Sequence, residues 1–172
     1  LPKPFQAPHP PVWVAASSTP AIEWAGGQGH SILMDPHSTR TDLGRKRRHY
    51  AAKLAEAGFT DSGRVIPMAR LIAVDETADK ARAVAKRVAE WTVASYVGPK
   101  HDNVRQEQRD FGGKDPVDYY LDDVMIHGTA ESVVDQIQAL GEQIGMTYLM
   151  AAPMSGRSFR LLTDKVLPRI AG

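Results

Sequence analysis

The sequence contains no cysteine. This absence excludes disulfide bonds, thiol catalysis and every metal or iron–sulfur site that needs a cysteine ligand. No segment approaches the roughly 18 uninterrupted apolar residues of a membrane-spanning helix. The proline-rich start, residues 1–11, also lacks the apolar core of a secretory signal. We therefore expect a cytoplasmic protein that does not bind membranes.

An excess of charge of one sign is missing too, because 21 basic residues balance 20 acidic ones. Such a balance gives no general attraction to nucleic acid or anionic lipid. The one dense basic run, residues 45–48, precedes an alanine-rich stretch and is typical of a solvated helix face. We expect no nucleic-acid partner. The length of 172 residues, of which 42% are hydrophobic, favours one folded domain.

Several motifs of known chemistry do not occur. The sequence has no G-x-G-x-x-G after a strand, no phosphate-binding G-x-x-x-x-G-K-[ST], no H-E-x-x-H and no G-x-S-x-G. Its six histidines show no spacing of three or four residues, so we expect no metal site. The pattern identifies no catalytic residue.

Short apolar runs alternate with amphipathic helical patterns along the chain. The runs predict buried strands at residues 12–16, 31–34, 65–74 and 147–151. The helical patterns predict helices at about 20–27, 42–57, 77–92, 129–144 and 158–170, with Thr19, Thr77 and Thr129 as N-caps. The fourth helix has one apolar stripe, formed by Val133, Val134, Ile137, Leu140 and Ile144. This alternation predicts an α/β fold of parallel β/α units, either an open sheet or half of a (β/α)₈ barrel.

Residues 97–123 break the alternation with paired glycines, two X-Pro breaks and many charges. We interpret them as an irregular insert with short helical pieces, within a single domain that spans residues 1–172. The acidic residues Asp118, Asp122 and Asp123 in this insert are more typical of a solvated surface than of a catalytic acid and base. We expect the three tryptophans, at positions 13, 24 and 91, to pack in the core or between helices and the sheet.

One strand end is suited to hold an anion. A predicted strand ends at Ala16, Ser17 and Ser18 follow, and a helix begins near Pro20. The free amides of a helix N-terminus bind phosphate, and serine hydroxyls add further donors. Serine and threonine also occur at helix starts for capping alone, so the residues leave both interpretations open.

Two stretches resemble the luciferase-like flavin-dependent monooxygenases. The first is residues 8–18, PHPPVWVAASS, which are followed by Glu23-Trp24-Ala25 and Gly29. The second is residues 127–133, which resemble the family's helix start Gly-Thr/Ser-Pro-Glu-x-Val, with Ala130 in place of the usual proline. Further similarities lie at residues 73–77, 146–150 and 165–170. All the similar stretches occur in the family's order, and together they extend over nearly the whole chain.

The resemblance implies a TIM barrel of which this chain is the C-terminal half, strands 5 to 8, without strands 1 to 4. It implies FMN as cofactor, with the phosphate at Ser17 and Ser18 and the ring across the barrel mouth near Ala16 and Met34. It also implies an oxidoreductase, a monooxygenase in which reduced flavin activates oxygen to oxidise a small organic substrate. Some relatives use a deazaflavin coenzyme and transfer hydride instead, and the residues leave this choice open.

Half a barrel has consequences for partners and activity. It exposes two unpaired strand edges and one face of its core, so we expect self-association or pairing with the missing N-terminal half. Many polar contacts of the family lie on strands 1 to 4, which leaves open whether this fragment alone is active. The alternatives are a non-catalytic half-barrel that binds flavin or phosphate, and an unrelated open α/β domain that binds a phosphorylated ligand.

Overall fold

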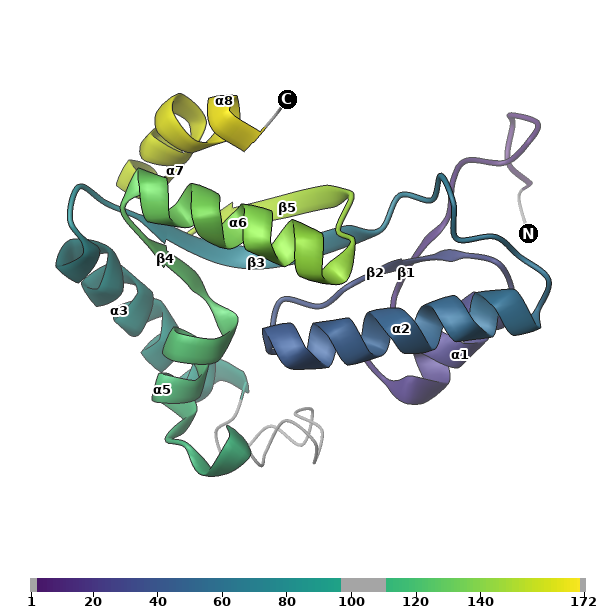
Figure 1. Cartoon of the computed structure of the whole chain (residues 1–172), viewed down its shortest axis with the longest axis horizontal. Coiled ribbons are helices and arrows are strands. Elements are labelled where there is room, and N and C mark those ends of the chain that lie inside the picture. Colours follow the sequence, from purple (N-terminus) through teal and green to yellow (C-terminus); the bar gives the residue numbers. More distant parts are fainter. Residues whose placement is uncertain (1–2, 97–110, 171–172) are drawn as a thin grey trace.

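The computed structural model of the protein describes residues 3–96 and 111–170, and strands alternate with helices along it as the sequence predicts (Figure 1). The strands are β1 (Trp13–Ala15), β2 (Ser31–Leu33), β3 (Pro67–Val74), β4 (Ile126–Gly128) and β5 (Tyr148–Pro153). The helices are α1 (Thr19–Gly27), α2 (Arg40–Glu56), α3 (Ala78–Tyr96), α5 (Pro116–Tyr119), α6 (Ala130–Ile144), α7 (Gly156–Leu161) and α8 (Leu167–Ile170). Short helical segments η1 (Phe111–Gly113), η2 (Tyr120–Val124) and η3 (Leu162–Val166) complete the described chain.

All strand pairs in the described residues are parallel, which confirms the predicted α/β class. β1 pairs with β2, a single bridge between Met34 and Met68 joins β2 to β3, and β3 pairs with β5. The predicted order of these four strands is thereby confirmed. β4 is an additional short strand that pairs with the end of β3, and the sequence pattern does not predict it.

β2 and β4 share one edge of β3. The backbone N–H of Met34 donates to Pro67 O at 2.9 Å, and that of Asp75 donates to Gly128 O at 3.1 Å. The backbone N–H and C=O groups of alternate residues in a strand point to the same edge. Positions 67 and 75 differ by an even number, so β2 and β4 lie on the same edge of β3. β2 has left this edge before β4 joins it, so the sheet forks around Arg70.

Alternate residues of β3 face two separate apolar clusters. Ile72 and Val74 pack with α1, α2, α6 and the C-terminal helices, whereas Leu71 and Ala73 pack with α3 and the helical turns of residues 111–124. The sheet is therefore covered on both faces near the end of β3. The stripe predicted on α6 is confirmed as buried at Val133, Val134, Ile137, Leu140 and Ile144.

Hydroxyl side chains cap the helices. Thr77 and Thr129 accept hydrogen bonds at the starts of α3 and α6, as predicted. The cap of α1 is Ser18 rather than Thr19, since Ser18 Oγ accepts from the Ala21 N–H at 3.3 Å. The run Ser-Thr-Pro offers two adjacent hydroxyls, and the helix begins one residue earlier than expected.

A hydroxyl also completes the central strand. The pairing of β3 with β5 ends at Ile72, so on the edge of β3 that faces β5, Val74 has no strand partner among the described residues. Ser158 on α7 is fully buried, and its Oγ accepts from the Val74 N–H and donates to the Val74 C=O, both at 3.1 Å. One side chain thus replaces a strand at this position.

Several burial expectations are wrong. β1 is not buried on both faces, because Trp13 is 43% exposed on a side that no described element covers. Trp24 and Trp91 are also exposed, on the outer surfaces of α1 and α3. An aromatic residue within a helical pattern does not by itself show which side of the helix faces the core.

The predicted insert lies partly outside the described residues, which resume at Phe111. Residues 111–123 form the expected short helical pieces, η1, α5 and most of η2. Tyr119 and Tyr120 are buried there against α3 rather than exposed in an irregular loop. Their aromatic rings give this segment a small core of its own.

Candidate functional site at the strand ends

A small pocket opens at the carboxyl ends of β1 and β2. Its volume is about 150 Å³, and it is lined by Ala15, Ala16, Ser17, Leu33, Met34, Asp35, Pro36 and Ala69. Ligands of parallel α/β folds bind at this end of the strands, because the loops and the helix N-termini converge there. The wall is mainly apolar, and the small side chains of three alanines leave the space open.

Three of the four site residues expected from the sequence meet at this pocket. Ser17 lies half-buried on its wall, while Ala16 and Met34 border it with side chains that belong to the core and are only 3% and 2% exposed. Ser18 does not line the pocket, because its hydroxyl caps α1. A contact between Ser18 and a phosphate stays a prediction.

The residues of the pocket fit one part of a flavin. Ser17 Oγ has no hydrogen-bond partner among the described residues and sits beside the start of α1, where a phosphate would meet free amides. Ala15, Leu33 and Ala69 offer an apolar surface to a flat ring. A volume of about 150 Å³ holds only part of such a ring, so further walls are needed to enclose a whole flavin.

A buried polar cluster follows the pocket in the loop after β2. Asp35 accepts hydrogen bonds from Lys46 Nζ at 3.0 Å, from Ser38 Oγ at 2.9 Å and from the backbone N–H of His37 at 3.0 Å. Burial by itself would raise the pKa of Asp35, but the Lys46 ammonium and these hydrogen bonds outweigh it and hold the pKa below its ordinary value. The carboxylate therefore stays ionised and anchors the loop.

Arg70 and His37 complete this cluster. Arg70 is 1% exposed and donates from Nη2 to Ser38 O at 3.0 Å, and burial lowers its pKa to about 10. Burial also lowers the pKa of His37, so the ring is neutral near pH 7. The His37 ring lies 5.6 Å from the ring of Tyr96 and 5.7 Å from that of Tyr120, both from the segments that cover the strand ends.

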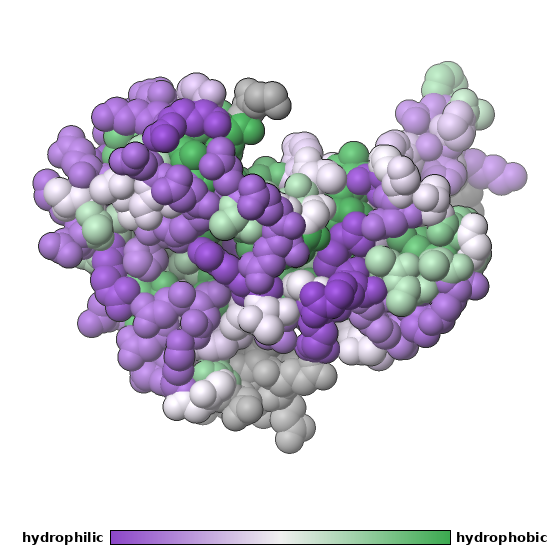
Figure 2. Space-filling view, in the orientation of Figure 1, coloured by the Kyte–Doolittle hydropathy of each residue, from purple (hydrophilic) through white to green (hydrophobic). Residues whose placement is uncertain are grey.

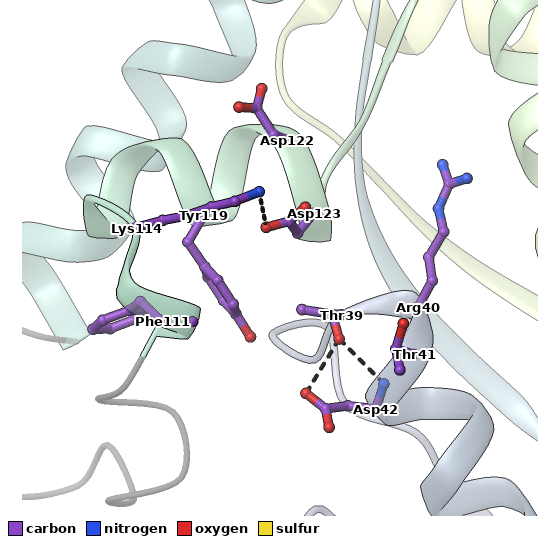
Figure 3. Close-up of a pocket in the computed structure, with 10 residues that line it drawn as sticks. Thr39, Arg40, Thr41, Asp42, Phe111, Lys114, Tyr119, Asp122 and Asp123 are labelled. Carbon is purple, nitrogen blue, oxygen red and sulfur yellow. Dashed lines mark hydrogen bonds and ion pairs between the residues drawn. The ribbon is translucent and has the colours of Figure 1, made fainter.

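A larger pocket, about 570 Å³, lies between the start of α2 and the insert helices (Figure 3). Thr39 caps α2 on one side, and the Tyr119 hydroxyl points into the pocket from the other. Burial, with Asp42 nearby, raises the pKa of Tyr119 to about 12, so the phenol is protonated at neutral pH.

The acidic residues of the insert are not brought together as a catalytic pair. Asp118 is exposed and lies outside the larger pocket. Asp122 pairs with Arg82 at 2.9 Å and Asp123 pairs with Lys114 at 2.6 Å, both at the pocket rim. Asp122 and Asp123 thus each have a cation of their own, in agreement with a solvated acidic surface.

The sequence pattern does not identify Arg70 and His37. They are 33 positions apart, and the fold brings them to one loop only through the bridge between β2 and β3. A signal was nevertheless present, because Arg70 is the only charged residue in a predicted buried strand. Buried charges are rare unless a partner or a ligand compensates them.

Two negative findings concern the described residues alone. No helix among residues 3–96 and 111–170 has the length and apolar character needed to cross a bilayer. Within the same ranges, no three potential metal ligands of the His, Cys, Asp or Glu type gather at one point.

The sequence matches the model of one protein family, luciferase-like monooxygenase, over residues 1–148. The chain therefore belongs to the luciferase-like monooxygenase family, as its resemblance implied. A search of curated protein sequences finds no match to this chain.

Solved structures show the same fold at low identity. The FMN complex of the oxygenating constituent of 3,6-diketocamphane monooxygenase from Pseudomonas putida is 21% identical, with TM-score 0.67 over 92% of this chain and 48% of that one. A riboflavin lyase with modified FMN and riboflavin is 21% identical, with TM-score 0.71 over 95% and 43%. The coenzyme F420 dependent tetrahydromethanopterin reductase from Methanopyrus kandleri is 19% identical, with TM-score 0.67 over 92% and 50%. The chain spans about half the length of these proteins.

Proposed function

We propose that the chain is the flavin-binding C-terminal half of a luciferase-like oxidoreductase, with FMN as its cofactor. The observation that carries the proposal is the pocket at the ends of β1 and β2, where Ser17 and the start of α1 adjoin an apolar wall. The parallel strands β1, β2, β3 and β5, which are neighbours in chain order, and coverage of 43–50% of the three proteins named above support a half-barrel. Reduced flavin, when bound, would supply the electrons that activate oxygen for oxidation of a small organic substrate.

The residues of this chain have defined parts in that proposal. The Ser17 hydroxyl and the free amides of α1 bind the phosphate, because both donate hydrogen bonds to an anion. Ala15, Leu33 and Ala69 exclude water from one side of the ring. The second half of the barrel, from a missing segment or another chain, supplies the remaining walls and the polar contacts of the reaction.

The phosphate contact is tested by comparing the affinities of the chain for FMN and riboflavin, which differ only in the phosphate. Ser17→Ala removes a hydrogen bond to a charged group, which contributes about 1.5–3 kcal/mol. We expect FMN affinity to fall roughly ten- to a hundredfold, at ~1.4 kcal/mol per factor of ten, with riboflavin affinity unchanged. Ser62→Ala, in an exposed loop, is the control. A Ser17→Ala protein that keeps the full preference for FMN would refute the proposal.

A deazaflavin coenzyme is the second candidate, and the likeness to a coenzyme F420 dependent enzyme favours testing it. Titration of the chain with coenzyme F420 and with FMN ranks the two cofactors directly. Oxygen uptake in the presence of reduced FMN, measured with the chain joined to the second half of the barrel, then separates a monooxygenase from a module that only binds flavin. Uptake no faster than that of free reduced FMN supports the non-catalytic alternative.

A further inference from the structure

The guanidinium of Arg70 sits at the fork of the sheet with part of its hydrogen-bonding capacity unused. The side chain is 1% exposed, and Nη2 donates to Ser38 O at 3.0 Å. Nη1 is also buried but has no partner, and among the described residues no carboxylate lies within ion-pair distance of Arg70. A buried charge without compensation is strongly unfavourable, so a structure that retains one implies a group that binds there.

The nearest acid does not compensate Arg70. Asp35 interacts with Arg70 electrostatically, but its oxygens are occupied by Lys46 Nζ at 3.0 Å and by Ser38 Oγ at 2.9 Å. One carboxylate thus faces two buried or nearly buried cations, and Arg40 adds a third positive charge nearby. The cluster has a net positive charge that the described residues do not balance.

A second buried nitrogen without a partner belongs to the same cluster. His37 Nδ1 is buried and has no hydrogen-bond partner, and His37 precedes Ser38, the residue to which Arg70 is bonded. Burial is the main cause that lowers the pKa of His37, and the Arg70 charge acts in the same direction. Neutral histidine donates through Nδ1 in one of its tautomers, so His37 Nδ1, like Arg70 Nη1, is a buried donor without an acceptor.

We propose that the fork between β2 and β4 binds a small oxyanion, such as the carboxylate of an organic acid, with Arg70 Nη1 as the charged donor and His37 as the second contact. A guanidinium and a carboxylate match in geometry and charge. The rings of Tyr96 and Tyr120 lie 5.6 Å and 5.7 Å from the ring of His37 and would border the bound ion. This site is separate from the proposed phosphate contact at Ser17 and does not depend on flavin.

The test is thermal unfolding of the chain in sodium formate, acetate or nitrate, each compared with sodium chloride at the same ionic strength. An oxyanion that binds only the folded state raises the unfolding temperature in a saturable manner. We expect this rise in the wild type, and an apparent affinity at least about tenfold weaker in Arg70→Met, since the charged donor is lost. Arg45→Met, an exposed position on α2, is the control that keeps the wild-type response.

Arg70→Met is expected to fold, because an apolar side chain of similar length replaces a buried charge. If it does not fold, Arg70→Lys keeps the charge but loses the fork of donors, and the same weakening is expected. The proposal is overturned if the anions do not raise the unfolding temperature of the wild type, or if they raise that of the Arg70 variant equally. A buried water would then be the partner of Arg70 Nη1.

The source of the oxyanion is distinguished by size and by chemistry. Stabilisation by formate and nitrate alone indicates a free ion, whereas a response that continues through propionate and benzoate indicates the acidic group of an organic ligand. A response to phosphate alone that Ser17→Ala abolishes would belong to the flavin pocket and would overturn the assignment to Arg70. Because no flavin is present, failure here leaves the proposed function untouched.

Discussion

The ring of Trp13 lies 5.7 Å from the ring of Tyr148, although β2 and β3 separate the strands that carry them. Neighbouring strands lie about 4.8 Å apart, so a flat sheet would hold β1 and β5 about 14 Å apart with their side chains side by side. The two rings meet because the four strands curve toward one another. Such curvature is what a segment of a barrel requires.

The concave side of this curved sheet predicts self-association. Tyr148, beside Trp13, is 50% exposed, and Met150, two residues further along β5, is 40% exposed. Figure 2 shows mostly hydrophilic residues on one face of the molecule, with apolar residues in the hollow between the C-terminal helices and the N-terminal segment. We expect concentration-dependent oligomers in sedimentation velocity, weakened in the double variant Tyr148→Ser, Met150→Ser.

Phe159 is 56% exposed and belongs to helix α7 rather than to the sheet, so Phe159→Ser is the matched control and should not change the oligomeric state. A wild-type chain that sediments as a monomer at every concentration would contradict the prediction.

We expect a large loss of stability when the charged side chain of Lys46 is replaced. It forms a pair with Asp35 in which both side chains are nearly buried, with 11% and 13% exposed. Removing one partner of such a pair leaves the other charge buried, so Lys46→Met should lower the free energy of unfolding by about 3 kcal/mol in urea titrations. Arg45→Met breaks an exposed pair with Asp42 on the same helix and should change stability little. Equal effects of the two substitutions would show that the cluster is not a structural anchor.

The two half-buried histidines predict a loss of stability in mild acid. Burial lowers the pKa of His37 and of His127 below the ordinary 6.5. The unfolded chain therefore binds more protons than the folded one as the pH falls below about 6.5, and stability present above that pH is lost toward the lowered pKa values. In urea titrations between pH 7 and pH 5, we expect a flatter profile for the double variant His37→Gln, His127→Gln.

His9→Gln is the control for this profile, because His9 is exposed in the N-terminal segment. Asp35, whose pKa is lowered, contributes in a different window: its stabilisation is present above about pH 4 and is lost only below it. A double variant with the wild-type slope between pH 7 and pH 5 would assign the loss to other groups.

The adjacent glycines at the end of α1 predict opposite responses to alanine. A Cβ added at Gly26 would lie 2.8 Å from Lys53 Cβ on α2, whereas one added at Gly27 would meet nothing within 4 Å. Gly26→Ala should force α1 and α2 apart and lower the free energy of unfolding, measured by thermal unfolding, by about 1–3 kcal/mol. Gly27→Ala should be neutral or slightly stabilising, since alanine favours the helix. A milder effect at Gly26 than at Gly27 would mean that α1 and α2 pack less closely.

The sequence predicts the strand order, the helix caps at Thr77 and Thr129 and the buried stripe of α6, because these depend on local periodicity and capping. It does not predict β4, whose three residues are too few to show a period, and it places the tryptophans in the core on residue type alone. In the candidate site, Ser17 is adjacent to a recognisable strand end. Arg70 and His37 meet only through the pairing of distant strands, which no local pattern encodes.

The hydroxyl of Ser158 that occupies the end of β3 has a consequence for the order in which the protein assembles. Val74 is synthesised 84 residues before the group that satisfies its backbone. During translation the end of β3 therefore lacks these two hydrogen bonds until α7 has left the ribosome, although β1, β2 and their helices have been synthesised earlier. The last helices thus complete the hydrogen bonding of the sheet. A chain truncated before Ser158 would leave the backbone N–H and C=O of Val74, at the end of the strand that bears Arg70, without this partner.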